Sequence, residues 1–362
     1  MNIHKKLTLI LMISFSLNLQ AQKMDPDFDI TSDDLTKINA AKTLFVVLQE
    51  VDPAIIKKLD NKNMNYEKEF YYQFVKDFNN KLKKTIPTNW PHQVDIQFKT
   101  LEEISQLKKE TDPNSLVMYL GFSVFSSGEP PGTTEYYTYP TSIHGLTTML
   151  QFYSSNNYHS PGHASVHRFE TFVGITTIDK MNFKRPPNTV IFEKLLHSVN
   201  PTEADLTMTL NYISWLISER AKNPATKISV LWVKNVNQLK DKILVIPQSL
   251  LITDYPYTLY NGYKEFVDSA NIEQLYPFQF EIVSDSIYEQ IIVNQKKGYA
   301  YLHVDVYPDD IINMAASITD AENGDLLLLA KPTSKKADDI YFMYFLHKNH
   351  FESISFYIKG GK

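Results

Sequence analysis

The chain has 362 residues, of which 36 are Lys or Arg and 41 are Asp or Glu, giving a formal net charge of −5. Hydrophobic residues make up 43% and charged residues 21%, a globular composition that excludes disordered, collagen-like and coiled-coil proteins. The length corresponds to roughly two domains. The chain contains no cysteine, which excludes disulfides, thiol chemistry, Cys-ligated zinc and the lipidated cysteine of a bacterial lipoprotein.

Residues 1–21 have the pattern of a cleavable secretory signal. Lys5 and Lys6 precede an apolar run over residues 7–17, and the segment ends on the small residue Ala21. This run is shorter than the roughly 20 residues that cross a bilayer, and no later run is long enough, so we expect no transmembrane segment. We therefore expect a periplasmic or secreted protein that is not a lipoprotein.

An acidic stretch, residues 22–41, follows the signal and is predicted to be a flexible leader. Removal of the signal with Lys5 and Lys6 would change the formal net charge from −5 to −7. Because a mildly acidic chain does not attract phosphate backbones, we expect no nucleic-acid partner.

The rest of the chain contains two stretches with the same order of predicted elements: strand, helix, strand, helix, three strands, helix, strand. In the first stretch they are predicted at residues 42–48, 66–82, 94–98, 101–109, 116–120, 172–178, 188–192, 206–217 and 227–233. In the second they are predicted at residues 242–248, 263–269, 278–282, 286–295, 299–304, 315–329 (a strand pair), 338–347 and 353–358. This order predicts an α+β fold, or mixed-sheet α/β, of two repeated units, each a mixed β-sheet flanked by helices.

Three local signals support particular elements. Thr202 with Asp205 resembles the capping box that begins a helix. Asn323-Gly324 favours a hairpin, because a type I′ turn needs positive φ at both central residues. Tyr66, Phe70, Phe74, Phe78 and Leu82 recur every four residues, and at helical spacing such a stripe is more often core than a ligand groove.

The predicted organisation is a first unit over residues 42–234 and a second over residues 242–362. Between equivalent strands, 56 residues separate Tyr119 from Ile175, but only 17 separate Tyr301 from Ile318. The first unit therefore carries an insertion, placed at residues 127–168. Insertions longer than roughly 12–15 residues are usually functional or disordered.

The insertion is rich in aromatic side chains among Ser, Thr, Asn and Gly, a composition that suits protein recognition. Its segments 134–139 and 149–153, turning near His144-Gly145, could form a protruding hairpin. A pore-forming hairpin and a plain cover for the sheet remain as alternatives. The candidate partner-binding residues are Tyr136, Tyr137, Tyr139, Phe152, Tyr153 and Tyr158.

Two segments of the second unit carry a family resemblance. Residues 243–247 resemble the first strand, and residues 318–327 the late hairpin, of envelope domains of the CsgG, LpoB and TolB N-terminal type. The resemblance covers the second unit better than the first, and it implies an envelope scaffold or assembly module without enzymatic activity. The chain departs from the group in two respects. CsgG and LpoB are lipoproteins, whereas this chain has no cysteine, and TolB carries a propeller, which has no counterpart in this sequence.

Catalytic motifs are absent from the sequence. It contains no phosphate-binding loop, no Gly-x-Ser-x-Gly elbow and no His-Glu-x-x-His. Residues 320–325 faintly resemble a calcium loop but are interpreted as a hairpin turn. His159, His163 and His167 form a weak candidate zinc site, which Pro161-Gly162 would confine to a loop. No catalytic residue, cofactor or metal is assigned.

The sequence favours an exported, non-enzymatic cell-envelope protein that acts as a scaffold or a protein-interaction module. Its expected partner is an envelope protein or a peptidoglycan-associated protein. Two alternatives stay open: a small-ligand-binding protein that uses the cleft between the units, and a metal-dependent hydrolase that uses the loop from His159 to His167.

Overall fold

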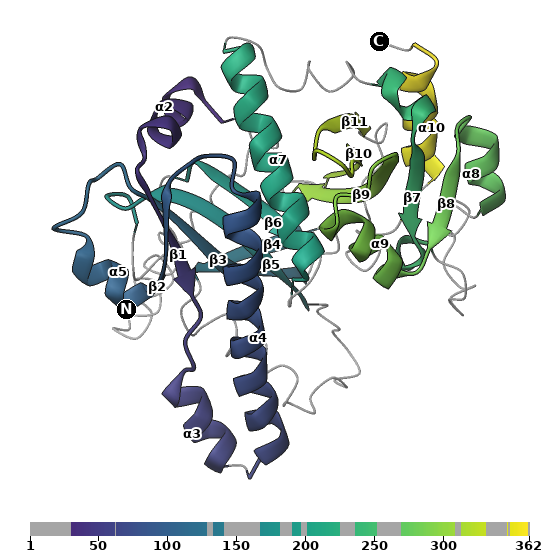
Figure 1. Cartoon of the computed structure of the whole chain (residues 1–362). Coiled ribbons are helices and arrows are strands. Elements are labelled where there is room, and N and C mark those ends of the chain that lie inside the picture. Colours follow the sequence, from purple (N-terminus) through teal and green to yellow (C-terminus); the bar gives the residue numbers. More distant parts are fainter. Residues whose placement is uncertain are drawn as a thin grey trace, which may run out of the picture.

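We describe a computed structural model of the chain. The structure describes residues 30–61, 63–128, 133–140, 167–181, 190–196, 201–224, 236–251, 269–307, 313–330, 346 and 348–360. These residues form two mixed β-sheets with helices on their faces (Figure 1).

The first sheet has the strand order β2-β1-β3-β5-β6, with β4 paired to the far end of β3. Its strands are β1 (Thr43–Leu48), β2 (Asp95–Thr100), β3 (Leu116–Gly128), β4 (Thr133–Pro140), β5 (His167–Thr177) and β6 (Phe192–Leu196). Strands β2, β1 and β3 run parallel, whereas β5 and β6 are antiparallel to their neighbours.

The second sheet repeats this arrangement in the order β8-β7-β9-β10-β11. Its strands are β7 (Ile243–Pro247), β8 (Phe280–Val283), β9 (Tyr299–Tyr307), β10 (Asn313–Asp320) and β11 (Leu326–Ala330). Here too the first three strands in space are parallel and the last two are antiparallel. The predicted α+β fold of two similar units is therefore confirmed.

The connections between parallel strands place helices on both faces of each sheet. The helices of the first unit are α2 (Ser32–Ala40), α3 (Pro53–Asn61), α4 (Asn65–Asn89), α5 (Leu101–Leu107) and α7 (Glu203–Lys222). The second unit has α8 (Ser269–Leu275), α9 (Asp285–Val293), α10 (Lys348–Ile358) and the short 3₁₀ helices η2 (Val236–Asp241) and η3 (Gln248–Leu250).

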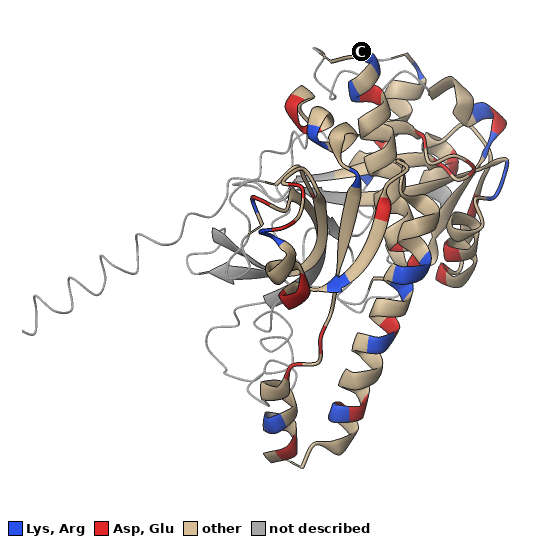
Figure 2. Cartoon of the chain, turned by 60° about the vertical axis from the view of Figure 1, so that its left-hand side comes forward, with Lys and Arg blue, Asp and Glu red and all other residues tan. Residues whose placement is uncertain are grey.

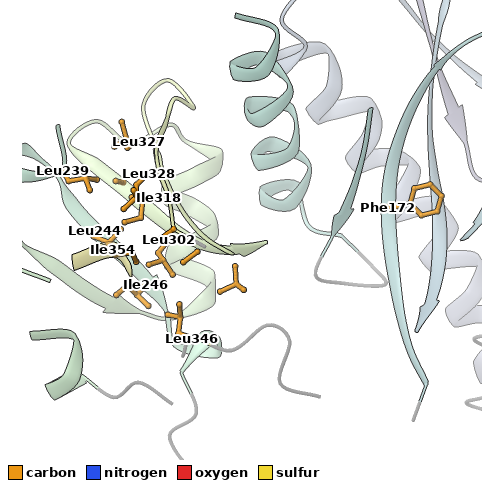
Figure 3. Close-up of a cluster of buried hydrophobic side chains, with 14 of the residues drawn as sticks. Phe172, Leu239, Leu244, Ile246, Leu302, Ile318, Leu327, Leu328, Leu346 and Ile354 are labelled. Carbon is orange, nitrogen blue, oxygen red and sulfur yellow. The ribbon is translucent and has the colours of Figure 1, made fainter. Parts of the chain in front are cut away.

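Alternate residues of β1 show which helices cover which face. Leu44 and Val46 pack on one face of the sheet, in the same cluster as Phe78 of α4 and Leu210 of α7. Phe45 packs on the other face, in the cluster that includes Ile104 of α5. In the second unit Leu244 and Ile246 lie on the side of α8 and α10, and Val245 packs against α9. Figure 3 shows the side chains of that second core grouped together, with Phe172 apart on the first sheet.

Helix α7 lies between the two sheets (Figure 1). On one side Leu210 and Ile213 pack in the core of the first sheet, together with Leu326 of β11. On the other side Ala204 and Met208 pack with residues of α9, β7 and β9. A helix that packs on one side only exposes a polar face on its other side. In α7 twelve residues, spread around the helix, are buried because both sides are packed.

Several predicted elements are observed within a few residues of their expected bounds, and the capping box at Thr202 is present. The prediction of a strand at residues 353–358 is wrong, because this segment belongs to helix α10. The predicted elements at residues 227–233, 263–268 and 338–345 lie outside the described residues.

The hairpin at Asn323-Gly324 is confirmed, but its turn is not a two-residue type I′ turn. Residues 321–325 connect β10 to β11, and among the described non-glycine residues only Asn63 and Gln295 have positive φ. Gly324 alone supplies a positive φ of 76° in the turn. The carboxylate of Asp320 accepts a hydrogen bond from the amide of Glu322 and pairs with Lys242 at 2.7 Å, so these groups hold the turn in place.

A tight contact in the first sheet depends on Gly174 of β5. Tyr119 of β3 is the register partner of Gly174, and its ring also packs edge-on against Phe172 at 5.9 Å. A Cβ atom at position 174 would lie 2.3 Å from Cζ of Tyr119. Because the ring occupies the space over the glycine, neither group can change without moving the other.

We expect Gly174→Ala to lower the free energy of unfolding by about 1–3 kcal/mol, because it overpacks a filled core. Urea unfolding measures this value. The same substitution in a Tyr119→Leu background should cost less, since the obstructing ring is gone. An equal cost in both backgrounds would mean that the ring is not the cause.

Candidate functional site

Some of the residues predicted to form a site lie on β4 and β5, the two strands that pair with β3 from either side. Tyr136, Tyr137 and Tyr139 lie in β4, whose register partner is the far end of β3. His167 is the first residue of β5 and pairs with Ser126. Lying outside the described residues are Phe152, Tyr153, Tyr158, His159 and His163. The first arm of the predicted hairpin is thus a strand, and the three-histidine site stays a prediction.

Helix α4 exposes two aromatic residues of the stripe that was predicted to be core. Phe78 and Leu82 are buried at 1% and 0% exposure, but Tyr66 is 81% exposed and Phe70 54%. A spacing of four residues turns by about 400°, so the stripe drifts about 40° per step around the helix. After four steps Tyr66 lies about 160° from Leu82, on the opposite face. The core interpretation is therefore wrong for Tyr66 and Phe70.

The exposed half of α4 forms an arm with α3. Figure 1 shows this pair of helices projecting beyond the first sheet. Ile55 and Leu59 of α3 pack against Tyr71, Phe74 and Val75 of α4, which gives the arm a small core of its own. Charged residues of both signs lie along its surface (Figure 2).

Two polar contacts join α3 and α4. The hydroxyl of Tyr71 accepts a hydrogen bond of 3.0 Å from the buried amide of Asp52, just before α3. Lys68 of α4 pairs with Asp60 of α3 at 2.6 Å. The second contact is solvent-exposed and adds little stability, so the aromatic core and the Tyr71 bond define the arm.

A groove of about 370 Å³ runs along the exposed face of α4. Its lining residues are Phe70, Gln73, Phe74, Asp77, Asn80, Lys81, Lys84 and Glu203. All but the last belong to α4, and at about 100° per residue Gln73, Asp77 and Lys84 lie on the same face as Tyr66. The groove is aromatic towards the tip of the arm and charged towards its base. We call Tyr66 together with these lining residues the α4 surface.

The base of the α4 surface is held by the N-terminus of α7. Lys84 pairs with Glu203 at 2.7 Å, and the ammonium group of Lys81 donates to the carbonyl of Pro201 at 3.2 Å. Behind them the capping box is closed: Asp205 accepts from the amide of Thr202 at 2.8 Å, and the Thr202 hydroxyl accepts from the amide of Asp205. These contacts connect α4 to the helix that joins the two units.

Two carboxylates of this region have raised pKa values because they are buried. Burial raises the pKa of Asp205, against the opposing effects of its hydrogen bonds with Thr202 and the charges of Lys81 and Lys194. Burial also raises the pKa of Glu289 on α9, with a further contribution from the charge of Asp205. Charging Asp205 therefore costs free energy that the capping bonds only partly recover.

We expect Asp205 to make stability depend on pH. Its folded pKa lies above the ordinary value of 3.8, so its contribution is fully present below that pH and is lost as the pH rises through the folded pKa. Asp205→Asn keeps an oxygen that can accept from Thr202 but removes the charge. Urea unfolding from pH 3.5 to 7 should therefore show the variant gaining stability relative to wild type as the pH rises, until Asp205 of the wild type is fully ionised.

The matched control is Asp34→Asn in the capping box of α2, where Thr31 and Asp34 make the same pair of bonds. It shows what exchanging a carboxylate for an amide does to an exposed capping box, together with the loss of the 3.2 Å ion pair between Asp34 and Lys37. A pH dependence that is the same in wild type and Asp205→Asn would contradict the assignment.

Two further features concern the described residues alone. None of their helices is both long enough and apolar enough to cross a membrane. Nor do they bring three or more His, Cys, Asp or Glu side chains together in a way that could hold a metal ion.

Comparisons with known proteins give no relative. No family model matches the chain, and neither a curated protein nor a solved structure matches it. The resemblance to envelope domains of the CsgG, LpoB and TolB type therefore stays a prediction.

Proposed function

We propose that the protein is an exported, non-enzymatic module of the cell envelope that binds a partner protein. The α4 surface is the binding site in this proposal, and the two sheets are the scaffold that holds it. The secretory pattern of residues 1–21 and the resemblance to envelope domains support the location. An envelope protein or a peptidoglycan-associated protein is the partner expected there.

One observation carries the choice of site: Tyr66 and Phe70 are large aromatic side chains left in solvent beside a groove. Scattered apolar residues on a surface need no explanation, but these two share a helix face with a cavity. Tyrosine and other aromatic residues supply much of the binding energy at protein interfaces. A partner segment with an apolar anchor for Phe70 and Phe74, and polar groups beside Asp77 and Asn80, fits the lining.

The rigidity of the arm supports the same function. Because Tyr71, Phe74 and Val75 are buried against α3, the exposed face of α4 is ordered before a partner arrives. A preorganised surface loses less conformational entropy on binding than a flexible one. The arm therefore offers its aromatic residues at a small entropic cost.

Strand β4 is a second candidate region for the same function. Tyr136, Tyr137 and Tyr139 lie on a strand that extends the first sheet beyond the end of β1, since β1 pairs only with residues 116–118 of β3. Because the α4 surface and the insertion belong to different segments, substitutions can remove either one and leave the other in place.

Phe70→Ser should leave the fold unchanged and weaken partner binding by at least about tenfold, because it removes an exposed anchor. The measurement is a pull-down from envelope extract, followed by titration of the captured protein. Phe356→Ser on α10 is the matched control, since Phe356 is 52% exposed and Phe70 is 54%. Both variants should keep the wild-type melting temperature. Equal capture by all three proteins would exclude the α4 surface.

Residues 127–166 can be replaced by Gly-Ser, because Ser126-Gly-Ser-His167 then forms a four-residue loop between the antiparallel register partners Phe125 and Arg168. The shortened protein should fold, since β3 and β5 then form a simple hairpin. It should still bind its partner if the α4 surface is the site. Loss of binding in a folded protein would assign the site to the insertion, and loss of folding would make the insertion structural.

A further inference from the structure

Strand β2 ends the strand order of the first sheet, and no other described strand pairs with its outer side. Its inner side pairs in parallel with β1 from Asp95 to Thr100. An edge strand of this kind presents backbone donors and acceptors to any strand that can lie beside it.

The register shows which residues face outward. The amide of Asp95 donates to the carbonyl of Lys42 at 2.9 Å, so the backbone of Asp95 faces inward to β1. Because backbone groups alternate along a strand, Gln97 and Lys99 also face inward, whereas Ile96 and Phe98 direct their N–H and C=O groups outward. The side chains of Ile96 and Phe98 pack at the margin of the first core and are only half-buried.

We propose that two copies of the chain associate by antiparallel pairing of their β2 strands, with a two-fold axis at Gln97. In this register Ile96 lies opposite Phe98 of the second copy, and the two residues exchange both backbone hydrogen bonds. The reciprocal pair does the same, so four backbone bonds form. Ile96 and Phe98 then cover each other's exposed sides.

The charges of β2 select this register. Asp95 of each copy lies opposite Lys99 of the other copy. The two-fold axis therefore gives two identical ion pairs between the strands. In the single chain Asp95 is exposed and accepts from the side-chain amide of Gln97, and Lys99, 34% exposed, is 3.8 Å from Glu103. Both therefore stay accessible for a cross-strand pair, which stabilises antiparallel strands.

The equivalent edge of the second sheet lacks this complementarity. Strand β8 has only four residues, Phe280–Val283, and Glu281 is the one charged residue among them. Antiparallel pairing of two β8 strands about Glu281 would place like charges opposite each other, which is destabilising. The repeat thus has two edges of the same topology, of which β2 alone is self-complementary.

The pairing can be tested with a single thiol, because the chain has no cysteine. Gln97 would lie opposite its own copy in a non-hydrogen-bonded pair, where Cα atoms are about 4.5 Å apart and a disulfide can form. Gln97→Cys should form a disulfide-linked dimer on mild oxidation at micromolar concentration, measured by non-reducing electrophoresis. Gln279→Cys, an exposed position directly before β8 that leaves Glu281 in place, is the control and should cross-link at least tenfold more slowly.

Charge exchange then tests the register. Asp95→Lys in the Gln97→Cys background should slow cross-linking by about tenfold, because both pairs become Lys opposite Lys. Adding Lys99→Asp should restore the rate, since the ion pairs re-form with their signs exchanged. Sedimentation of the wild-type chain provides a measurement without substitutions and should show a concentration-dependent dimer.

Three results would overturn the proposal. The first is a wild-type chain that stays monomeric at every concentration, as it would if residues 227–233 of the same chain covered the edge. The second is cross-linking of Gln97→Cys at the rate of Gln279→Cys. The third is a cross-linking rate of Gln97→Cys that does not fall with Asp95→Lys, or that does not recover when Lys99→Asp is added. Circular dichroism confirms that each variant is folded, and none of them alters the α4 surface.

Discussion

The packing of α7 on two sides is the constraint on which the rest of the structure depends. Leu210 and Ile213 bury one side of the helix against the first sheet, while Ala204 and Met208 bury another against the second unit. Gly324 completes this contact, because a Cβ there would lie 2.5 Å from Asn211 of α7. Neither unit could move away without exposing a largely apolar helix, which costs roughly 25 cal/mol for each Å² returned to water.

The same helix fixes the position of the α4 surface. Its N-terminus carries Glu203, which pairs with Lys84, and the buried capping box of Thr202 and Asp205 holds that turn. The exposed ion pair adds little stability by itself, but the packing of α4 on α7 behind it is extensive. The arm is therefore anchored to the boundary between the units, and the α4 surface and α7 form one structural element.

The local sequence pattern predicted the central strands correctly. It failed for residues 353–358, whose apolar residues fit both the period of a strand and the period of a helix. The apolar runs at 43–48 and 243–247 are buried central strands, as expected from their length and β-branched residues. Residues 353–358 alternate like a strand, yet Phe351, Ile354 and Ile358 also repeat at helical spacing. The helix buries Phe351 and Ile354 in the second core and packs Ile358, partly buried, against it. The pairing of β4 with β3 could not be predicted from the sequence either. It depends on the fact that β3 extends beyond the end of β1 and leaves residues 121–128 free to pair with β4.

The α4 surface arises from a mismatch of lengths that no local pattern encodes. Helix α4 has 25 residues and spans about 37 Å, whereas the six residues of β1 span about 20 Å. Only the C-terminal part, from Phe78 to Ile86, can therefore pack on the sheet. The remainder finds one partner in α3, which covers Tyr71 and Phe74 but is too short to surround the helix. Tyr66 and Phe70 are exposed because the helix is longer than the sheet that it covers.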